Sequence, residues 1–104
     1  MEELDYDPAL LTTDLTDEAA LKALRAAKKG IQDLDSFDAS SFEGALRPLA
    51  SELGLKTGQF FGLLRVATTG RTAAPPLFQT MAILGQERCL KRIEAALNRL
   101  RVGT

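Results

Sequence analysis

Residues 57–70 of the 104-residue chain read TGQFFGLLRVATTG. This stretch predicts a helix from about Gly58 to Thr68, capped by Thr57 and ended by Gly70. Its apolar residues are not confined to one face, which is typical of a helix that is buried on most sides. We therefore expect this helix at the centre of the fold, with the other elements packed around it.

The N-terminal part of the chain predicts another helix, from about Thr16 to Ala27. Thr16 is its expected N-cap, and the acidic residues that follow suit the positive end of a helix dipole. The sequence Lys-Lys-Gly at 28–30 is a typical signal for the end of a helix. Before this helix, residues 7–11 favour a short helical turn.

A third predicted helix precedes the central one. Ser40 and Glu43 have the spacing of a capping box at its start, and Gly54 marks its end. We expect the acidic residues 33–41 to form the loop that leads into it, with Phe37 as the apolar anchor of that loop.

Two more helices are predicted after the central one. Pro75 and Pro76 open a helix that ends at Leu84, where Gly85 is the stop signal, and a last helix runs over about 86–101. Strands are not expected, because β-branched residues are sparse and two-residue alternation is rare. The sequence therefore predicts an all-α fold, a compact bundle or cage of about five helices, and a single domain over residues 1–104.

The composition excludes several classes of chemistry. The chain has no His, and its one Cys is Cys89, which rules out an internal disulfide, a Cys-rich metal site and any catalytic pair that needs histidine. We expect Cys89 to be packed rather than reactive. No catalytic residue and no metal site is predicted, and no apolar run reaches the length of a membrane helix.

The charge of the chain is divided unevenly. Residues 1–54 contain 12 acidic and 5 basic residues, a net charge of −7, whereas residues 55–104 contain 2 acidic and 8 basic residues, a net charge of +6. Such polarity suggests that the second half meets a polyanion. The alternative is that the two halves attract each other, or that the division has no function.

Arg65 is the most informative single residue, because it is the only charged residue between Lys56 and Arg71 in the most apolar helix. An arginine in such surroundings must reach solvent, an acidic residue or a ligand. Thr68, Thr69 and Arg71 then concentrate hydrogen-bond donors at the end of the helix. Donors of this kind suit phosphates or exposed base edges, although ordinary capping chemistry would also explain them.

The segment after these donors adds four further candidates. Pro75 and Pro76 begin a helix whose first amides form a natural anion site. Leu77 and Phe78 either pack in the core or offer an apolar platform to an unstacked base.

The last predicted helix carries basic residues near one face. These residues are Arg88, Arg92 and Arg99, with Lys91 beside them. They form a modest basic stripe that could contact a nucleic-acid backbone. The alternative is a solvated face with pairing along the helix, such as Lys91 with Glu94.

Four blocks of this sequence together resemble a known family. They are LGLKTGQFF at 53–61, LRVATTGR at 64–71, APPLF at 74–78 and LGQER at 84–88. In this order and near this spacing they resemble the C-terminal anticodon-binding domain of bacterial-type glutamyl-tRNA synthetases, over roughly residues 5–100. The resemblance implies a helical domain that binds the anticodon loop of tRNA(Glu) and so supports the selection of tRNA for glutamylation.

The resemblance also assigns residues to the binding site. Arg65 matches the arginine that lies at the anticodon pocket in relatives, and Ala74, Pro75, Pro76 and Leu77 match the part that cradles the anticodon bases. Relatives often have Ser or Thr in place of Ala74, so a hydroxyl contact is absent here. Pro76 likewise removes an amide donor. The donors Thr68, Thr69 and Arg71 complete the expected RNA-binding set, with Arg88 and Arg92 as weaker basic contacts to the backbone.

The family comprises class I synthetases, whose catalytic domain carries the HIGH-like and KMSKS-like signatures. Neither signature occurs in this sequence. We therefore expect a C-terminal piece of a larger glutamate–tRNA ligase that is not itself an enzyme and holds no cofactor, with ATP and Mg bound by the catalytic domain. The expected partners are tRNA(Glu) and the rest of the synthetase chain, not DNA or a membrane, and the expected location is the cytoplasm.

The resemblance further implies that a preceding helical subdomain, absent from this sequence, supplies part of the anticodon site. Binding by this chain is therefore expected to be weak and sensitive to salt. The alternative function is a helical protein-interaction or structural end-domain that does not read RNA.

Overall fold

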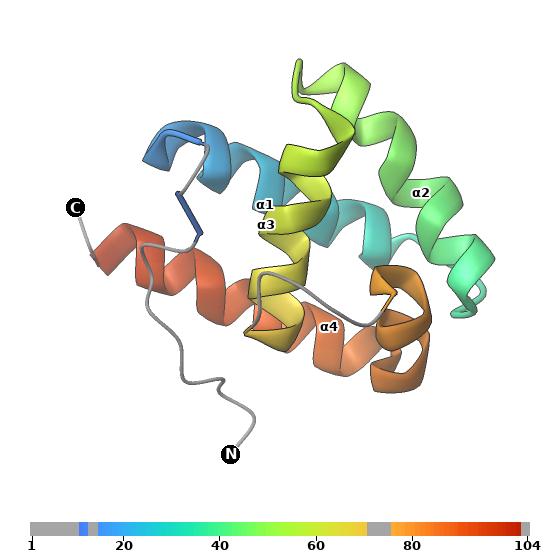
Figure 1. Ribbon diagram of the computed structural model, residues 1–104. Coiled ribbons are helices and arrows are strands. Elements are labelled where there is room, and N and C mark those ends of the chain that lie inside the picture. Colours follow the sequence, from blue (N-terminus) through green and yellow to red (C-terminus); the bar gives the residue numbers. More distant parts are fainter. Residues whose placement is uncertain (1–10, 13–14, 71–75, 103–104) are drawn as a thin grey trace.

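The computed structural model describes the backbone of residues 11–12, 15–70 and 76–102, and the side chains of these residues up to 100 (Figure 1). This part of the chain contains four α-helices and no strand. The helices are α1 (Asp17–Gln32), α2 (Ala39–Glu52), α3 (Thr57–Thr69) and α4 (Leu77–Val102). The predicted all-α class is confirmed. The predicted turn over 7–11 lies outside the described residues except for Leu11, which belongs to a short 3₁₀ turn with Thr12 and is buried.

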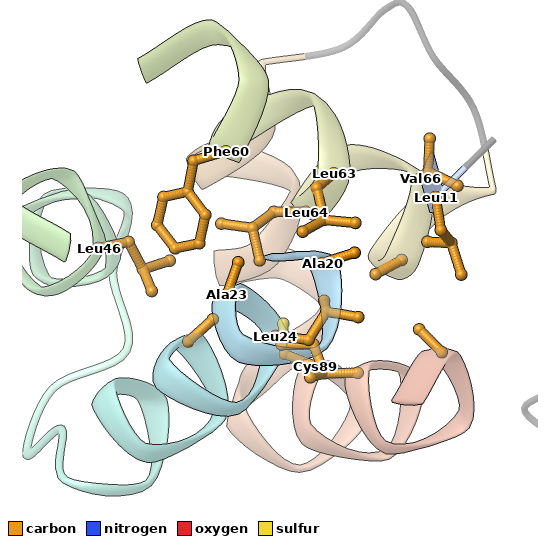
Figure 2. Close-up of a cluster of buried hydrophobic side chains, with 14 of the residues drawn as sticks. Leu11, Ala20, Ala23, Leu24, Leu46, Phe60, Leu63, Leu64, Val66 and Cys89 are labelled. Carbon is orange, nitrogen blue, oxygen red and sulfur yellow. The ribbon is translucent and has the colours of Figure 1, made fainter. Parts of the chain in front are cut away.

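The helix predicted at the centre is α3. It packs against all three other helices (Figure 1), but so does each of α1, α2 and α4, and α4 packs most extensively. The buried residues of α3 cover about half of the helix circumference. They are Phe60, Leu63, Leu64, Val66, Ala67 and Thr68. Figure 2 shows Phe60 and Leu64 of α3 directed toward Ala23 of α1, with Leu46 of α2 beside them. Burial of these apolar side chains, at about 25 cal/mol per Å² of apolar surface, is the main source of stability for such a fold.

The fourth and fifth predicted helices are joined in α4. Gly85 lies within this element at φ 85° and ψ 164°, which is not a helical conformation, so two helical segments meet at a kink. A positive φ is sterically accessible to glycine because it has no Cβ. The prediction that Gly85 stops one helix before the next begins is therefore consistent with the structure.

The predicted end of α1 is wrong. The helix continues through Gly30 to Gln32, and Ile31 is fully buried. A Cβ placed on Gly30 would lie 3.4 Å from Leu49 Cδ1 of α2. Gly30 is thus a point of close helix–helix approach and not a stop signal. The start is as predicted, since the Ala19 amide donates to Thr16 Oγ1 over 3.1 Å.

The start of α2 also differs from the prediction. The N-cap is Asp38 and not Ser40, because Asp38 Oδ1 accepts a hydrogen bond of 2.8 Å from the Ser41 amide. Glu43, the other half of the predicted capping box, pairs instead with Arg47 over 2.7 Å. The loop before α2 is not anchored by Phe37, which is 41% exposed.

At α3 the N-cap is Lys56, and Thr57 is already the first residue of the helix. Gln59 Oε1 accepts a hydrogen bond of 3.1 Å from the Lys56 amide, which satisfies a donor at this end. At the other end Gly70 adopts φ 74° and donates its amide to Val66 O over 2.8 Å, as predicted for the stop signal.

Helices α1 and α4 are also joined by polar contacts. Lys28 Nζ lies 2.6 Å from Glu94 Oε2, and Gln86 Nε2 donates to Ile31 O over 3.0 Å. Lys28 belongs to the half of the chain with net negative charge, and Glu94 to the half with net positive charge. Each residue of this ion pair therefore carries the minority charge of its half. None of the helices described is both long and apolar enough to cross a membrane.

Candidate nucleic-acid interface

Arg65 lies on α3 one turn before the end of the helix, and its side chain is half-buried. Its Nε is buried and has no hydrogen-bond partner in the part of the chain that the structure describes. A buried guanidinium N–H without an acceptor is costly, and this group is able to donate to an oxygen or nitrogen of a ligand. The Nε of Arg92 is buried in the same way, so this feature alone does not single out Arg65. Of the three possibilities raised by the sequence, pairing of Arg65 with an acidic residue is not seen among the described residues.

Arg65 shares its face of α3 with two other half-buried residues. Phe61 precedes it by four residues and Thr69 follows it by four, and residues at this spacing lie next to each other on a helix. Phe61 contacts Phe78 of α4 edge to face, with ring centroids 4.9 Å apart, and the guanidinium of Arg47 lies 5.4 Å from the Phe61 centroid. This face therefore combines aromatic surface with two arginines.

The two threonines at the end of α3 use their hydroxyls within the helix. Thr68 is fully buried, and its Oγ1 donates to Leu64 O over 2.7 Å. Thr69 Oγ1 donates to Arg65 O over 2.5 Å. Donation to the carbonyl four residues back is common for threonine in helices. The structure thus gives both hydroxyls the local role that was the alternative to ligand contact, and the side chain of Thr68 faces the core.

Arg92 lies on α4, but its guanidinium reaches the end of α3. Its Nη1 donates to Thr68 O over 2.6 Å, and its side chain is half-buried. A cation at this position is favoured by the negative end of the α3 dipole. The structure therefore gives Arg92 an intramolecular contact that its predicted position on a basic stripe did not suggest.

The remaining basic residues of α4 do not form one continuous solvated stripe. Arg88 is exposed, whereas Arg92 turns inward. Lys91 pairs along the helix with Glu87 over 3.6 Å, as in the alternative to a nucleic-acid stripe, although its partner is not Glu94, which pairs with Lys28.

The two described site residues at the start of α4 differ in their exposure to solvent. Pro76 is exposed and its carbonyl accepts from the Thr80 amide, whereas Leu77 is only 3% exposed and packs in the core. Leu77 can therefore offer a ligand its backbone but not its side chain. The other predicted residues of this segment, Arg71, Ala74 and Pro75, lie outside the described residues.

Cys89 is packed, in line with the prediction. It is fully buried, and its thiol lies 3.5 Å from Met81 O. Burial raises the pKa of the Cys89 thiol to about 11, while the nearby Arg92 guanidinium acts in the opposite direction. A thiol with a raised pKa is a poor nucleophile near neutral pH. Across the described residues there is also no group of three His, Cys, Asp or Glu side chains that could hold a metal ion.

Sequence reasoning missed Phe61 and Arg47 as neighbours of the candidate site. The spacing of Phe61 and Arg65 was visible in the sequence and could have identified their common face. The approach of Arg47 depends on how α2 packs against α3, and no local pattern in the sequence encodes it.

Comparison with known proteins supplies independent information. A family model described as an anticodon binding domain matches residues 1–97. A glutamate–tRNA ligase of Dehalococcoides mccartyi is 55% identical over 100 residues, which cover 95% of this chain and 20% of the relative. A glutamate–tRNA ligase of Roseiflexus castenholzii is 50% identical over 95 residues, which cover 90% of this chain and 19% of that protein. A glutamate–tRNA ligase of Chloroflexus aurantiacus is 43% identical over 93 residues, which cover 88% of this chain and 18% of that protein. The chain therefore spans about a fifth of the length of these relatives.

Proposed function

The chain belongs to the anticodon-binding domain family, and we propose that it binds the anticodon loop of tRNA(Glu) as part of a glutamate–tRNA ligase. The family match over residues 1–97 is the observation that carries this proposal. The names of the similar proteins, all glutamate–tRNA ligases, support the choice of tRNA.

The geometry of α3 is compatible with reading a single-stranded loop. Proteins recognise such loops by hydrogen bonds to the edges of splayed bases and by stacking on aromatic or guanidinium planes. Arg65 has a buried Nε without a partner among the described residues, and Phe61 provides an aromatic neighbour on the same face. We assign Arg65 the role of base-edge donor.

The charge of the chain supports a second, weaker component of binding. The net charge of +6 over residues 55–104 attracts the phosphate backbone without regard to base sequence. Binding should therefore consist of a salt-sensitive attraction and a smaller contribution from base reading.

The activity of the whole protein forms part of the same proposal. A glutamate–tRNA ligase joins glutamate to its tRNA at the expense of ATP, and the catalytic part of the enzyme would hold ATP and Mg. The role of this chain is then to select the tRNA. We place the protein in the cytoplasm, where tRNA is charged and used.

The test is an amide NMR titration of the chain with the anticodon stem-loop of tRNA(Glu) at low salt. A stem-loop of the same length with a scrambled anticodon is the control. We expect amide shifts in α3 around Arg65 with the tRNA(Glu) loop and not with the scrambled loop. Equal shifts with both loops would reduce the function to charge attraction, and no shift with either would favour the protein-interaction alternative.

Two variants assign the effect to Arg65. Arg65→Ala should weaken binding of the tRNA(Glu) loop by about 10- to 100-fold, the range for loss of a good base contact. Arg25→Ala removes the same charge from an exposed position on α1 and should change affinity by less than about threefold. Circular dichroism establishes that both variants are folded. Equal losses in the two variants would contradict a specific role for Arg65.

A further inference from the structure

Two side-chain hydrogen bonds and one backbone hydrogen bond reach carbonyls in the last turn and a half of α3. The final carbonyls of any helix lack partners within the helix itself. In α3, Val66 O accepts the Gly70 amide over 2.8 Å, and Thr68 O accepts Arg92 Nη1 over 2.6 Å. One turn earlier, Arg65 O receives an additional hydrogen bond from Thr69 Oγ1. The carbonyls of Arg65, Val66 and Thr68 therefore all accept hydrogen bonds, and the bond to Thr68 O comes from outside α3.

Of these three hydrogen bonds, only the one from Arg92 comes from another helix. It lies 24 residues after Thr68 in sequence, on the second segment of α4, so its hydrogen bond ties the end of α3 to α4. The contact is strengthened by charge, since a guanidinium donor at a helix C-terminus interacts favourably with the dipole. Arg88, one turn earlier on α4, is exposed.

We propose that Arg92 is a positioning residue for RNA binding: it anchors the C-terminal end of α3 and so fixes the orientation of Arg65. The proposal rests on the proposed function, because it concerns the same binding face. It replaces the expectation that Arg92 touches the RNA backbone directly. The two roles make different predictions, because a phosphate contact releases a counterion on binding and an internal anchor does not.

The salt dependence of binding separates these roles. Affinity for the tRNA(Glu) stem-loop and for the scrambled loop is measured over a series of salt concentrations for the wild-type chain, Arg92→Gln and Arg88→Gln. A lost phosphate contact lowers the slope of log affinity against log salt by about 0.7 to 1 and weakens both loops alike. A lost anchor weakens binding of the tRNA(Glu) loop by about tenfold, the order expected for a charge-assisted hydrogen bond. It leaves the slope unchanged, and the scrambled-loop affinity changes by less than about threefold, as for the loss of any single charge.

The expected result is the second pattern for Arg92→Gln, accompanied by amide shifts at Thr68, Thr69 and Gly70 in the free protein. Arg88→Gln, the matched loss of charge at an exposed site, should leave those amides in place. A reduced slope with Arg92→Gln, or unchanged affinity in a folded Arg92→Gln protein, overturns the proposal.

A second variant covers the case in which Arg92→Gln does not fold. Arg92→Lys retains the charge and one donor group but not the guanidinium fork, and it should lose less affinity than Arg92→Gln while showing smaller shifts at Thr68 to Gly70. Arg92→Lys binding identical to wild type in both affinity and α3 shifts overturns the proposal. If the wild-type chain does not discriminate between the two loops, the proposed function fails first and the role of Arg92 fails with it.

Discussion

Replacing Gly30 by alanine should stabilise the protein, although the sequence marks this glycine as the end of a helix. In the structure Gly30 lies inside α1, where alanine is favoured over glycine by about 0.5 to 1 kcal/mol because the unfolded chain loses less entropy. The added Cβ would meet Leu49 Cδ1 at 3.4 Å and Leu46 Cδ2 at 3.9 Å. The first distance is at the tight limit of ordinary van der Waals contact, but the atom met is the end of a flexible side chain, so the methyl group is accommodated without displacing α2.

The same substitution at Gly70 should have the opposite effect. Gly70 has φ 74°, in the left-handed region, where a Cβ costs about 1 to 2 kcal/mol. Both variants add one methyl group, Gly30→Ala in a helical backbone and Gly70→Ala in a left-handed one. The expected difference in the free energy of unfolding between Gly30→Ala and Gly70→Ala is therefore about 1.5 to 3 kcal/mol.

Urea unfolding followed by the helical circular dichroism signal measures both values. For a domain of this size each kcal/mol corresponds to about 4 to 8 °C in Tm, so thermal melts provide a second readout. A Gly30→Ala protein that is less stable than wild type by more than about 1 kcal/mol would refute the reasoning. It would mean that Leu49 cannot accommodate the methyl group, or that Gly30 does not have an ordinary helical conformation.

Two further predictions concern titrating groups. Burial raises the pKa of Cys89 from 9.0 to about 11, so the stability contributed by the protonated thiol is complete below about pH 9 and is lost as pH rises toward 11, by about 1.4 kcal/mol per pH unit. Urea unfolding of the wild-type chain and Cys89→Ala across this range should show the extra slope only in the wild type, and an identical slope in both would contradict it. Hydrogen bonds from Ser41, its amide first, lower the pKa of Asp38 below 3.8. The stability due to ionised Asp38 is thus present above pH 3.8 and is lost as pH falls through its lower folded value. Asp38→Asn should flatten the acid limb of the stability curve, and an unaltered limb would argue against the cap.

The helices were largely predictable because their signals are local. The apolar residues of α3 and the glycines at 54, 70 and 85 act within a few residues of their own position, and the structure agrees with each of them. Gly30 shows where such reasoning fails. The sequence Lys-Lys-Gly is the same whether a helix ends there or a second helix approaches, and only the packing of α2 against α1 decides between the two.

The candidate site was predictable in its residue types but not in their roles. Arg65 stood out because a charge in an apolar helix needs an explanation wherever the helix lies. Arg92 looked like part of a basic stripe, because residue spacing on α4 carries no information about the end of α3. Its contact with Thr68 O is made between residues 24 positions apart and depends on the tertiary fold. The sequence left the role of Thr68 open for the same reason, since its burial follows from the neighbours of α3.

Under the proposed function, electrostatic attraction of RNA and base reading are separable in this chain. The two acidic residues of the second half, Glu87 and Glu94, are each engaged by a lysine, and the net positive charge acts over a distance of only about 8 to 10 Å at physiological salt. A field of this range concentrates RNA at the surface but does not distinguish bases. Discrimination requires donors at fixed positions, and the backbone at and after Arg65 accepts hydrogen bonds from Thr69 Oγ1 and Arg92 Nη1. Added salt should accordingly weaken the affinity for the tRNA(Glu) loop and for the scrambled loop in parallel, with their ratio nearly constant. A ratio that collapses toward one as salt increases would show that the apparent discrimination was itself electrostatic.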